Sequence, residues 1–173
     1  CVIPLTSKKN NLGPFKKKNA IEKKMSVQGI ATDWSRYVGK WYEQARIPSW
    51  FEPRTMTDST AEYQLFTNNG SIRVINRGLD SMGNPVVARG NATIDSGSLG
   101  TLNVSFFPPI SSKYIVIDHG DAEYDMTVVA SPSRDYLWLL TRNSQLVPRQ
   151  WSRFLSAAQR AGYVDLSQVQ QTP

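Results

Sequence analysis

One aromatic residue and one cation, far apart in the chain, constrain the fold most. Trp41 lies in Gly39-Lys40-Trp41-Tyr42-Glu43, near the start of a run that alternates like a β-strand, and Arg142 ends the later alternating run 136–142. The closed end of a small β-barrel must be plugged, and an indole whose face is capped by a guanidinium can plug it. Gly39 leaves room for the chain to cross close beneath the barrel. The pair therefore favours a small β-barrel whose first strand holds Trp41 and whose last strand ends at Arg142.

Short alternating runs, separated by turn residues, continue between these two points and predict an all-β fold. Asn68-Asn69-Gly70 and Gly83-Asn84-Pro85 are typical turn sequences. Because every connection is short, we expect neighbouring strands to be antiparallel, and about eight of them close naturally into an up-and-down barrel. The expected strands are 41–47, 59–66, 72–77, 86–94, 101–107, 113–117, 124–130 and 136–142.

The pattern becomes helical from Pro148 to Ala161, with proline at the entrance and Gly162 at the exit. Apolar residues at spacings of three and four form a single stripe, which predicts a helix packed on the outside of the barrel wall. Asp33 is expected to cap the short turn 34–37 before the first strand. The predicted fold is an eight-stranded antiparallel up-and-down barrel with a C-terminal helix, formed by residues 29–173.

Residues 1–28 are expected to form a Lys-rich, flexible tether rather than part of this domain. Seven lysines against one glutamate between positions 8 and 24 account for the whole net charge of +6. Such a segment can bind an anionic membrane surface or serve only as a solvated spacer. A nucleic-acid partner is not expected, because the domain itself has no basic stripe.

Cys1 is the single cysteine, so no internal disulfide can form. A cysteine at the first position is what a bacterial lipoprotein has after its signal peptide is cut. We therefore expect Cys1 to carry a lipid anchor. The alternative is a chain that simply begins there.

The residues give little support for catalysis, a metal or a cofactor. The only histidine, His119, lies in a polar, turn-like segment. No cluster of cysteine and histidine matches a metal site, and no Gly-rich phosphate-binding loop is present. We therefore expect a binding protein rather than an enzyme, with no cofactor and no metal.

Strand alternation predicts which side chains line the barrel. If Trp41 and Arg142 face inward at the closed end, residues of the same parity on their strands also face inward. On the other strands the parity is chosen from composition and from the motif alignment described below. Tyr42, Gln44 and Arg46 are expected to face outward. The expected ligand-binding residues are Glu43, Ala45, Ala61, Tyr63, Val74, Asn76, Leu102, Val104, Phe106, Tyr114, Val116, Trp138 and Leu140.

Small residues recur at the inward positions, among them Ala61, Ala88 and Gly90. Because side chains can only just fill an eight-stranded barrel, small residues leave volume for a ligand. A solid core is the alternative. The surrounding aromatic and aliphatic residues, with few polar groups, suit a long acyl chain with a polar head. With no lysine or arginine expected in the cup, a polyanionic ligand is not expected.

Trp50 and Phe51 follow Pro48 in the loop after the first strand. Two large apolar side chains in a loop require a contact. They can form a lid over the open mouth, which would add them to the ligand site. The alternative is that they pack onto the barrel rim.

Several pieces of the sequence, in this order, resemble the lipocalin family. The similarity is to the bacterial outer-membrane lipocalins and, more distantly, to apolipoprotein D. Gly39, Trp41 and Arg142 match the family's structural motif, and its middle motif falls on Asp135 and Tyr136. The matching segments are 39–46, 74–78, 104–107, 134–142 and 169–171. The Lys-rich segment is not part of the family pattern.

The resemblance implies a calyx that binds fatty acids or lysophospholipids for storage or transfer of membrane lipids, with an anchor at Cys1. Val2, which is not aspartate, implies sorting to the outer membrane, facing the periplasm. The protein would be secreted if it is not bacterial. Some members of the family dimerise, so a homodimer stays open.

Two other functions also stay open. The first is a lipid-modifying enzyme that uses the same cavity with Glu43 as base, since a carboxylate facing an apolar cavity would have a raised pKa. The second is a structural protein whose tail binds membrane or envelope polymers.

Overall fold

The computed structural model describes residues 26–49, 55–66 and 68–172. Two helices are present in this part of the chain, α1 (Trp34–Tyr37) and α2 (Pro148–Arg160). The strands are β1 (Gly39–Arg46), β2 (Thr57–Phe66), β3 (Ser71–Leu79), β4 (Pro85–Ile94), β5 (Thr101–Phe107), β6 (Ile110–Asp118), β7 (Met126–Ala130), β8 (Leu137–Thr141) and β9 (Gln170–Gln171).

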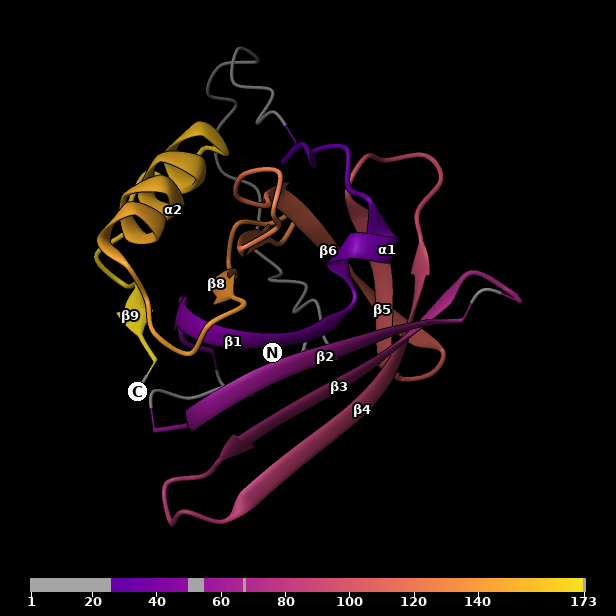
Figure 1. Ribbon diagram of the computed structural model, residues 1–173, viewed down its shortest axis with the longest axis horizontal. Helices are drawn as coiled ribbons and strands as arrows, with labels where there is room; N and C mark the ends of the chain where they lie inside the picture. Colours follow the sequence, from indigo (N-terminus) through magenta and orange to yellow (C-terminus); the bar gives the residue numbers. More distant parts are fainter. Residues whose placement is uncertain (1–25, 50–54, 67, 173) are drawn as a thin grey trace, which may run out of the picture.

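Strands β1 to β8 form a closed antiparallel barrel. Each strand pairs with the next along the chain, and β8 pairs with β1, which also pairs with β2 and so completes the ring. The short strand β9 pairs with the end of β1 (Figure 1). The predicted fold, eight up-and-down strands with a helix outside, is confirmed.

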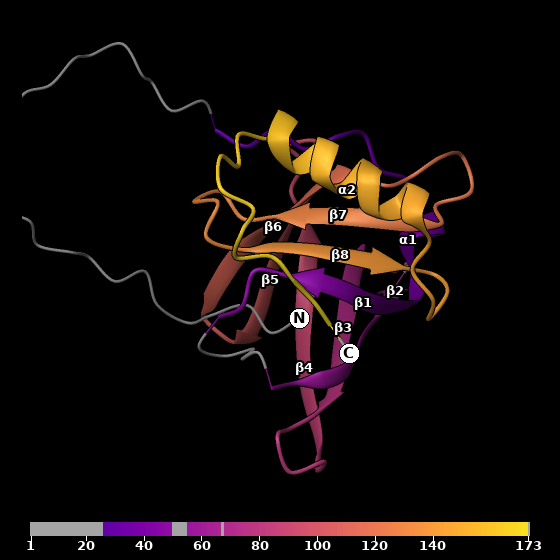
Figure 2. The same cartoon turned by 90° about the vertical axis from the view of Figure 1, so that its left-hand side faces the viewer.

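Local signals read from the sequence set the ends of these elements. The Asp33 carboxylate accepts a hydrogen bond from the backbone N–H of Ser35 at 3.0 Å, so it caps α1 as expected. In the turn after β2, the Asn69 side chain accepts from the N–H of Ser71 at 3.0 Å. The next hairpin, between β3 and β4, projects beyond the other strands (Figure 2).

Strand β1 contains a β-bulge that reverses the expected alternation. Glu43 pairs with Leu140, but Ala45 pairs with the adjacent residue Leu139, so Gln44 is the extra residue. From this point the parity of β1 is shifted by one residue. The predictions that Ala45 faces inward and Arg46 outward are therefore wrong.

Helix α2 packs on the outside of the barrel against β6 and β7, and Figure 2 shows it alongside β7. Phe154, Ala157 and Ala158 are buried there against a second apolar cluster that includes Val128 and Leu139. The predicted position of the helix is confirmed. In the described part of the chain, no helix has the length and apolar character needed to cross a membrane.

A group of ion pairs fixes α2 to the loop that follows β6. The buried Asp118 carboxylate accepts from Nε of Arg153 at 2.9 Å and from Nη2 of Arg160 at 3.2 Å. Asp121 accepts from Nη1 of Arg153 at 2.6 Å. These contacts orient the helix and do not reach the barrel interior.

Candidate ligand-binding site

Trp41 and Arg142 close one end of the barrel. The guanidinium carbon of Arg142 lies 3.7 Å from the centroid of the Trp41 ring, and Trp41 is fully buried. Arg142 also donates to the backbone carbonyls of Lys40 at 3.0 Å and Val38 at 3.0 Å. Gly39 has φ +97°, and a Cβ there would lie 3.3 Å from Nη1 of Arg142. The predicted plug, cap and glycine are confirmed.

Three buried tyrosines, Tyr37, Tyr63 and Tyr114, form a floor at the plugged end, where the Tyr37 and Trp41 ring centroids lie 5.1 Å apart. The Tyr63 hydroxyl donates to that of Tyr114 at 2.9 Å, and the hydroxyls of Tyr114 and Tyr37 lie 2.6 Å apart. Tyr37 donates to Oγ1 of Thr127 at 3.3 Å, and Thr127 donates to the carbonyl of Asp118 at 3.2 Å. This chain gives the phenols partners inside the protein, so the floor is a packed part of the barrel.

Burial also holds these phenols neutral. It raises the pKa of Tyr37 from 10.0 to about 12, the largest cause being removal of the hydroxyl from water. The same cause raises the pKa of Tyr114 well above 10.0, and the neighbouring phenols Tyr37 and Tyr63 raise it further. Tyr37 and Tyr114 therefore stay protonated to a higher pH than phenols in water do.

Most of the side chains expected to line the barrel do lie together in one buried cluster inside it. Glu43 and Asn76 are also buried and face inward, because Glu43 lies opposite Leu140 and Asn76 opposite Ala61. The expected residues in the cluster, or packed against it, are Ala61, Tyr63, Val74, Leu102, Val104, Phe106, Tyr114, Val116, Trp138 and Leu140.

Three predicted ligand-binding positions differ or lie outside the described residues. Ala45 belongs to the outer cluster under α2, because of the bulge in β1. Trp50 and Phe51, the expected lid, lie outside the described residues. Asp135 is exposed. By contrast, Tyr136 packs against the inner cluster and stacks on Trp138, with ring centroids 5.9 Å apart. This contact could have been predicted, because Tyr136 and Trp138 are two residues apart and so face the same side of the sheet.

The bulge places a buried ion pair inside the barrel, near the end of β1. Arg46 lies opposite the inward-facing Trp138. It forms a salt bridge with Glu43, and the side chains of Arg46 and Glu43 are each 1% exposed. Thr172 donates to the Glu43 carboxylate at 2.9 Å and accepts from Arg46 at 3.2 Å. The expectation of no arginine in the cup is therefore wrong. The expectation that Glu43 faces an apolar cavity, on which its possible role as a base rested, is also wrong, because Arg46 and Thr172 contact its carboxylate.

Asn76 is polar and buried, and its side chain has no hydrogen-bond partner among the residues that the structure describes. It is 3% exposed, yet neither its amide oxygen nor its amide nitrogen is bonded to another group. Its neighbours across the two adjacent strands, Ala61 and Ala88, are small and apolar. An amide buried without partners typically lowers the stability of the fold by about 1–3 kcal/mol. A polar group of a bound ligand could supply the missing hydrogen bond.

The inward face of β4 shows how far the barrel is open. Val86 and Ala88 are partly exposed, whereas Gly90 and Ala92 are buried. Gly90 does not leave free volume, because a Cβ there would lie 2.8 Å from the ring of Phe106. The partly exposed positions, Val86 and Ala88, lie where β4 pairs with β3 alone, and the packed positions begin at Gly90, next to the residues that pair with β5.

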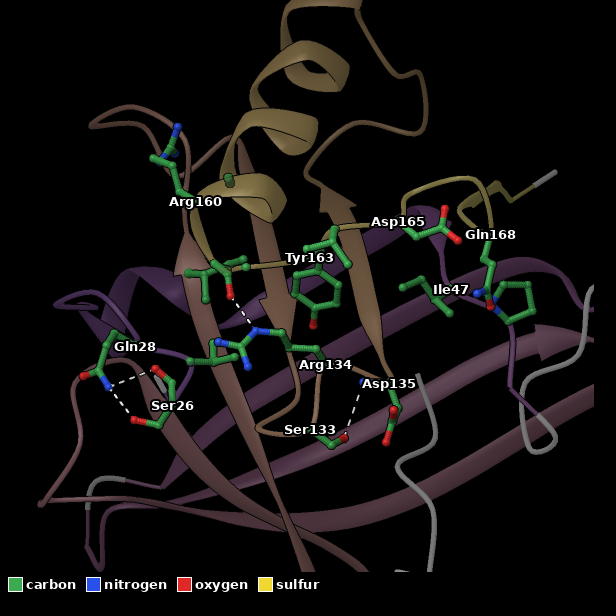
Figure 3. Close-up of a pocket in the computed structure, with 17 residues that line it drawn as sticks. Ser26, Gln28, Ile47, Ser133, Arg134, Asp135, Arg160, Tyr163, Asp165 and Gln168 are labelled. Carbon is green, nitrogen blue, oxygen red and sulfur yellow. Dashed lines mark hydrogen bonds between the residues drawn. The ribbon is translucent and has the colours of Figure 1, made fainter. Parts of the chain in front are cut away.

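A second hollow, a groove of about 940 Å³, lies outside the barrel below the end of α2 (Figure 3). Nε of Arg134 donates there to the backbone carbonyl of Ala161 at 2.7 Å. The Tyr163 hydroxyl donates to the backbone carbonyl of Tyr136 at 2.5 Å. These side chains bind the end of the helix to the turn between β7 and β8. The groove is a seam between secondary-structure elements, with mixed charges and no convergent set of polar groups.

Within the described ranges, no three side chains of histidine, cysteine, aspartate or glutamate gather where they could hold a metal ion. The polar groups that the structure describes in the barrel interior include two amide atoms, an ion pair and phenols.

A closed eight-stranded barrel with one plugged end, a largely apolar interior and an outer helix defines a calyx of the type that binds small hydrophobic ligands. Residues 32–173 match the lipocalin-like domain family, and the chain belongs to that family. It is 37% identical to the outer membrane lipoprotein Blc of Vibrio cholerae over 75% of each chain. It is 31% identical to temperature-induced lipocalin-1 of Arabidopsis thaliana, over 85% of this chain and 81% of the relative.

Solved structures share the fold at lower identity. Insecticyanin of the tobacco hornworm Manduca sexta superposes with a TM-score of 0.69 at 17% identity, over 86% of this chain and 85% of that one. The cockroach allergen Per a 4 superposes with a TM-score of 0.67 at 18% identity, over 86% and 92%. At this identity the likeness supports the fold alone.

Proposed function

We propose that this lipocalin holds a single-chain lipid, a fatty acid or a lysophospholipid, in the open half of its barrel. The acyl chain would lie along the small and apolar side chains, above the tyrosine floor. Each buried CH₂ group contributes about 0.8 kcal/mol to such binding. Storage or transfer of membrane lipids is the role that follows from this ligand.

The unpartnered amide of Asn76 is the observation that carries the proposal. A carbonyl, carboxyl or hydroxyl oxygen of a ligand could accept from its nitrogen, and a hydroxyl could donate to its oxygen. A purely structural core would gain stability from an apolar residue at this position. A ligand that is mostly apolar and carries one polar group fits the position better than a pure hydrocarbon does.

The charges at the mouth narrow the class of ligand. Arg46 places a cation inside the barrel, but Glu43 balances it, so the pair brings no net charge. A neutral, zwitterionic or singly charged head group suits this balance, and a polyanion does not.

The location of the protein is a further part of the proposal. Relatives at 37% and 38% identity carry the name outer membrane lipoprotein, which supports a place at the outer membrane, facing the periplasm. A lipid on Cys1 would hold the domain there, and the Lys-rich segment would span the distance to the bilayer. Both lie outside the described residues, and mass spectrometry of protein extracted from membranes tests the lipid directly.

A titration with lysophosphatidylcholine and with the matching free fatty acid, each below its critical micelle concentration, tests the ligand class. The fluorescence of Trp138 and Trp41 reports on the barrel interior. We expect saturable one-site binding at micromolar or lower concentration. Asn76→Leu should weaken it about tenfold, the equivalent of one lost hydrogen bond of about 1.4 kcal/mol.

Asn91→Leu is the matched control, because Asn91 lies on the adjacent strand β4 and is exposed on the outer face. It should leave binding unchanged. No response of the natural protein to either lipid would overturn the proposed ligand class. Equal affinity of the Asn76→Leu variant would overturn the role of the amide.

A further inference from the structure

Two large apolar side chains lie exposed at the turn between β5 and β6. Phe107 is 58% exposed and Ile110 is 46% exposed, and they pair across the turn on either side of Pro108 and Pro109. From Ser105 to Ser112 the sequence contains no charged residue. Large apolar side chains gathered in an exposed turn indicate a contact with another surface.

This turn borders the open mouth of the barrel. Strand β1 begins at the closed end and ends at the open end. Because consecutive strands are antiparallel, β3, β5 and β7 also run from the closed end to the open end. Strand β5 is one of those that end there. Phe106, the residue before Phe107, packs against the inner cluster, so consecutive side chains point into the barrel and out from its rim.

The turn has few backbone groups that would lose water on entering an apolar medium. Neither proline has an N–H group, and the carbonyl of Ile110 accepts from Oγ of Ser105 at 2.5 Å. Burying an unpaired backbone polar group is costly, so this turn enters a lipid phase at a lower cost than an ordinary hairpin turn would.

A cation lies beside the turn. Arg89 is exposed on β4, and it has the same outward parity as Asn91, which pairs with Ser105 on β5. No ion pair joins Arg89 to another residue in the described ranges. An arginine next to an apolar tip is suited to the phosphate of a phospholipid head group.

We propose that the β5–β6 turn docks the open end of the barrel onto a phospholipid bilayer, with Phe107 and Ile110 in the interfacial region and Arg89 at the head groups. A protein partner normally requires about 800 Å² of complementary surface on each side, far more than one narrow turn offers. A bilayer requires no shape complementarity, and aromatic side chains favour its interface.

The docked orientation would let a lipid pass between the bilayer and the barrel without crossing bulk water. That consequence rests on the proposed ligand. The docking itself does not, because it depends only on the exposed turn. It also differs from the anchoring expected of Cys1 and the Lys-rich segment, since it depends on the side chains of the β5–β6 turn.

Co-sedimentation of the non-acylated full chain with phosphatidylcholine vesicles tests the docking. The salt concentration should be about 1 M, where the Debye length is about 3 Å and attraction through the lysines is screened. We expect the natural protein to partition onto the vesicles. Phe107→Ser together with Ile110→Ser should lower the partition coefficient at least about tenfold, since burial of large apolar side chains would be lost.

Leu99→Ser is the matched control, because Leu99 is 65% exposed on the turn between β4 and β5, at the closed end of the barrel. It should partition like the natural protein, and thermal melting should show that all variants are folded. Equal partitioning of the double variant, or no partitioning of the natural protein, would overturn the proposal.

A second readout does not depend on loss of binding. The fluorescence of a Phe107→Trp variant should shift to the blue on vesicles and be quenched by lipids brominated near the head group, and an unchanged spectrum would contradict docking through this turn. The double variant should still bind monomeric lysophosphatidylcholine in solution. If the natural protein binds vesicles but no monomeric lipid, the proposed function is contradicted and the docking proposal is supported.

Discussion

Arg142 and Trp41 lie at opposite ends of the barrel sequence, and the guanidinium of one rests 3.7 Å from the ring centroid of the other. The same arginine donates to several carbonyls of the segment that enters β1, including that of Arg36 at 2.8 Å. One side chain therefore joins the last strand, the first strand and the α1 segment. The contact closes the barrel at the end away from the candidate site.

Loss of this contact should lower stability and leave lipid affinity nearly unchanged. We expect Trp41→Ala to reduce the free energy of unfolding by about 3–5 kcal/mol, because it empties a fully buried site. Arg142→Ala should cost about 1–3 kcal/mol, since several carbonyls lose their donor. Urea unfolding measures both. Lost lipid binding at an unchanged unfolding midpoint would contradict this separation of roles.

The ion pair between Glu43 and Arg46 should be strongly coupled. Arg46→Met removes the guanidinium beside a buried carboxylate, and we expect a loss of about 3–5 kcal/mol of stability. Adding Glu43→Gln to that variant should recover part of the loss, because no buried charge is then left without its counterion. A double-mutant cycle by urea unfolding measures the coupling. Strictly additive effects would show that the two side chains do not depend on each other.

The tyrosine floor should make stability depend on pH in the alkaline range. Burial raises the pKa of Tyr37 from 10.0 to about 12, so between these values the unfolded chain has lost a proton that the folded chain keeps. The free energy of unfolding should therefore fall as pH rises, by about 1.4 kcal/mol per pH unit for this group, and the contribution is fully present below pH 10.

Urea unfolding between pH 9 and about 11.5 measures that slope. Tyr37→Phe, which cannot ionise, should show a shallower slope even though its overall stability is lower. The same slope in the variant and in the natural protein would mean that Tyr37 is not the group responsible. Tyr114 adds to the slope in both proteins, because burial raises its pKa as well.

Much of the barrel could be predicted from the sequence because its strands alternate regularly. On β2, β3, β5 and β6 the inward parity was correct, and the turn glycines and the helix ends lie where the pattern indicated. The plug formed by Trp41 and Arg142 was also predictable. Predicting this contact requires only that a tryptophan opens the first strand and an arginine ends the last strand. It does not require the register between the strands.

The site near the open end could not be predicted in full, for a physical reason. A β-bulge at Gln44 changes the register by one residue, and parity then fails for every later position on that strand. Ala45 moved to the outer cluster and Arg46 to the interior. Thr172, which contacts Arg46, comes from the far end of the sequence. No local sequence pattern indicates that this end of the chain pairs with β1.

Composition was also an incomplete guide to free volume. Gly90 was expected to leave space for a ligand, yet Phe106 from the neighbouring strand fills it. Asn76 was expected to be one of a few polar groups in the cup, and only the structure shows that its amide is buried without a partner.

The most direct test of the central claim places a large side chain in the open half of the barrel and measures lipid affinity. Ala88→Trp suits this better than Ala61→Trp, because Ala61 lies directly opposite Trp41 and is 1% exposed, whereas Ala88 is partly open. Asn91→Trp adds the same side chain to the outer face of β4. Calorimetric titration with a fatty acid should show at least about tenfold weaker binding for Ala88→Trp, because the chain is excluded, and unchanged binding for Asn91→Trp. Equal affinity of a folded Ala88→Trp variant would contradict a ligand site inside the barrel.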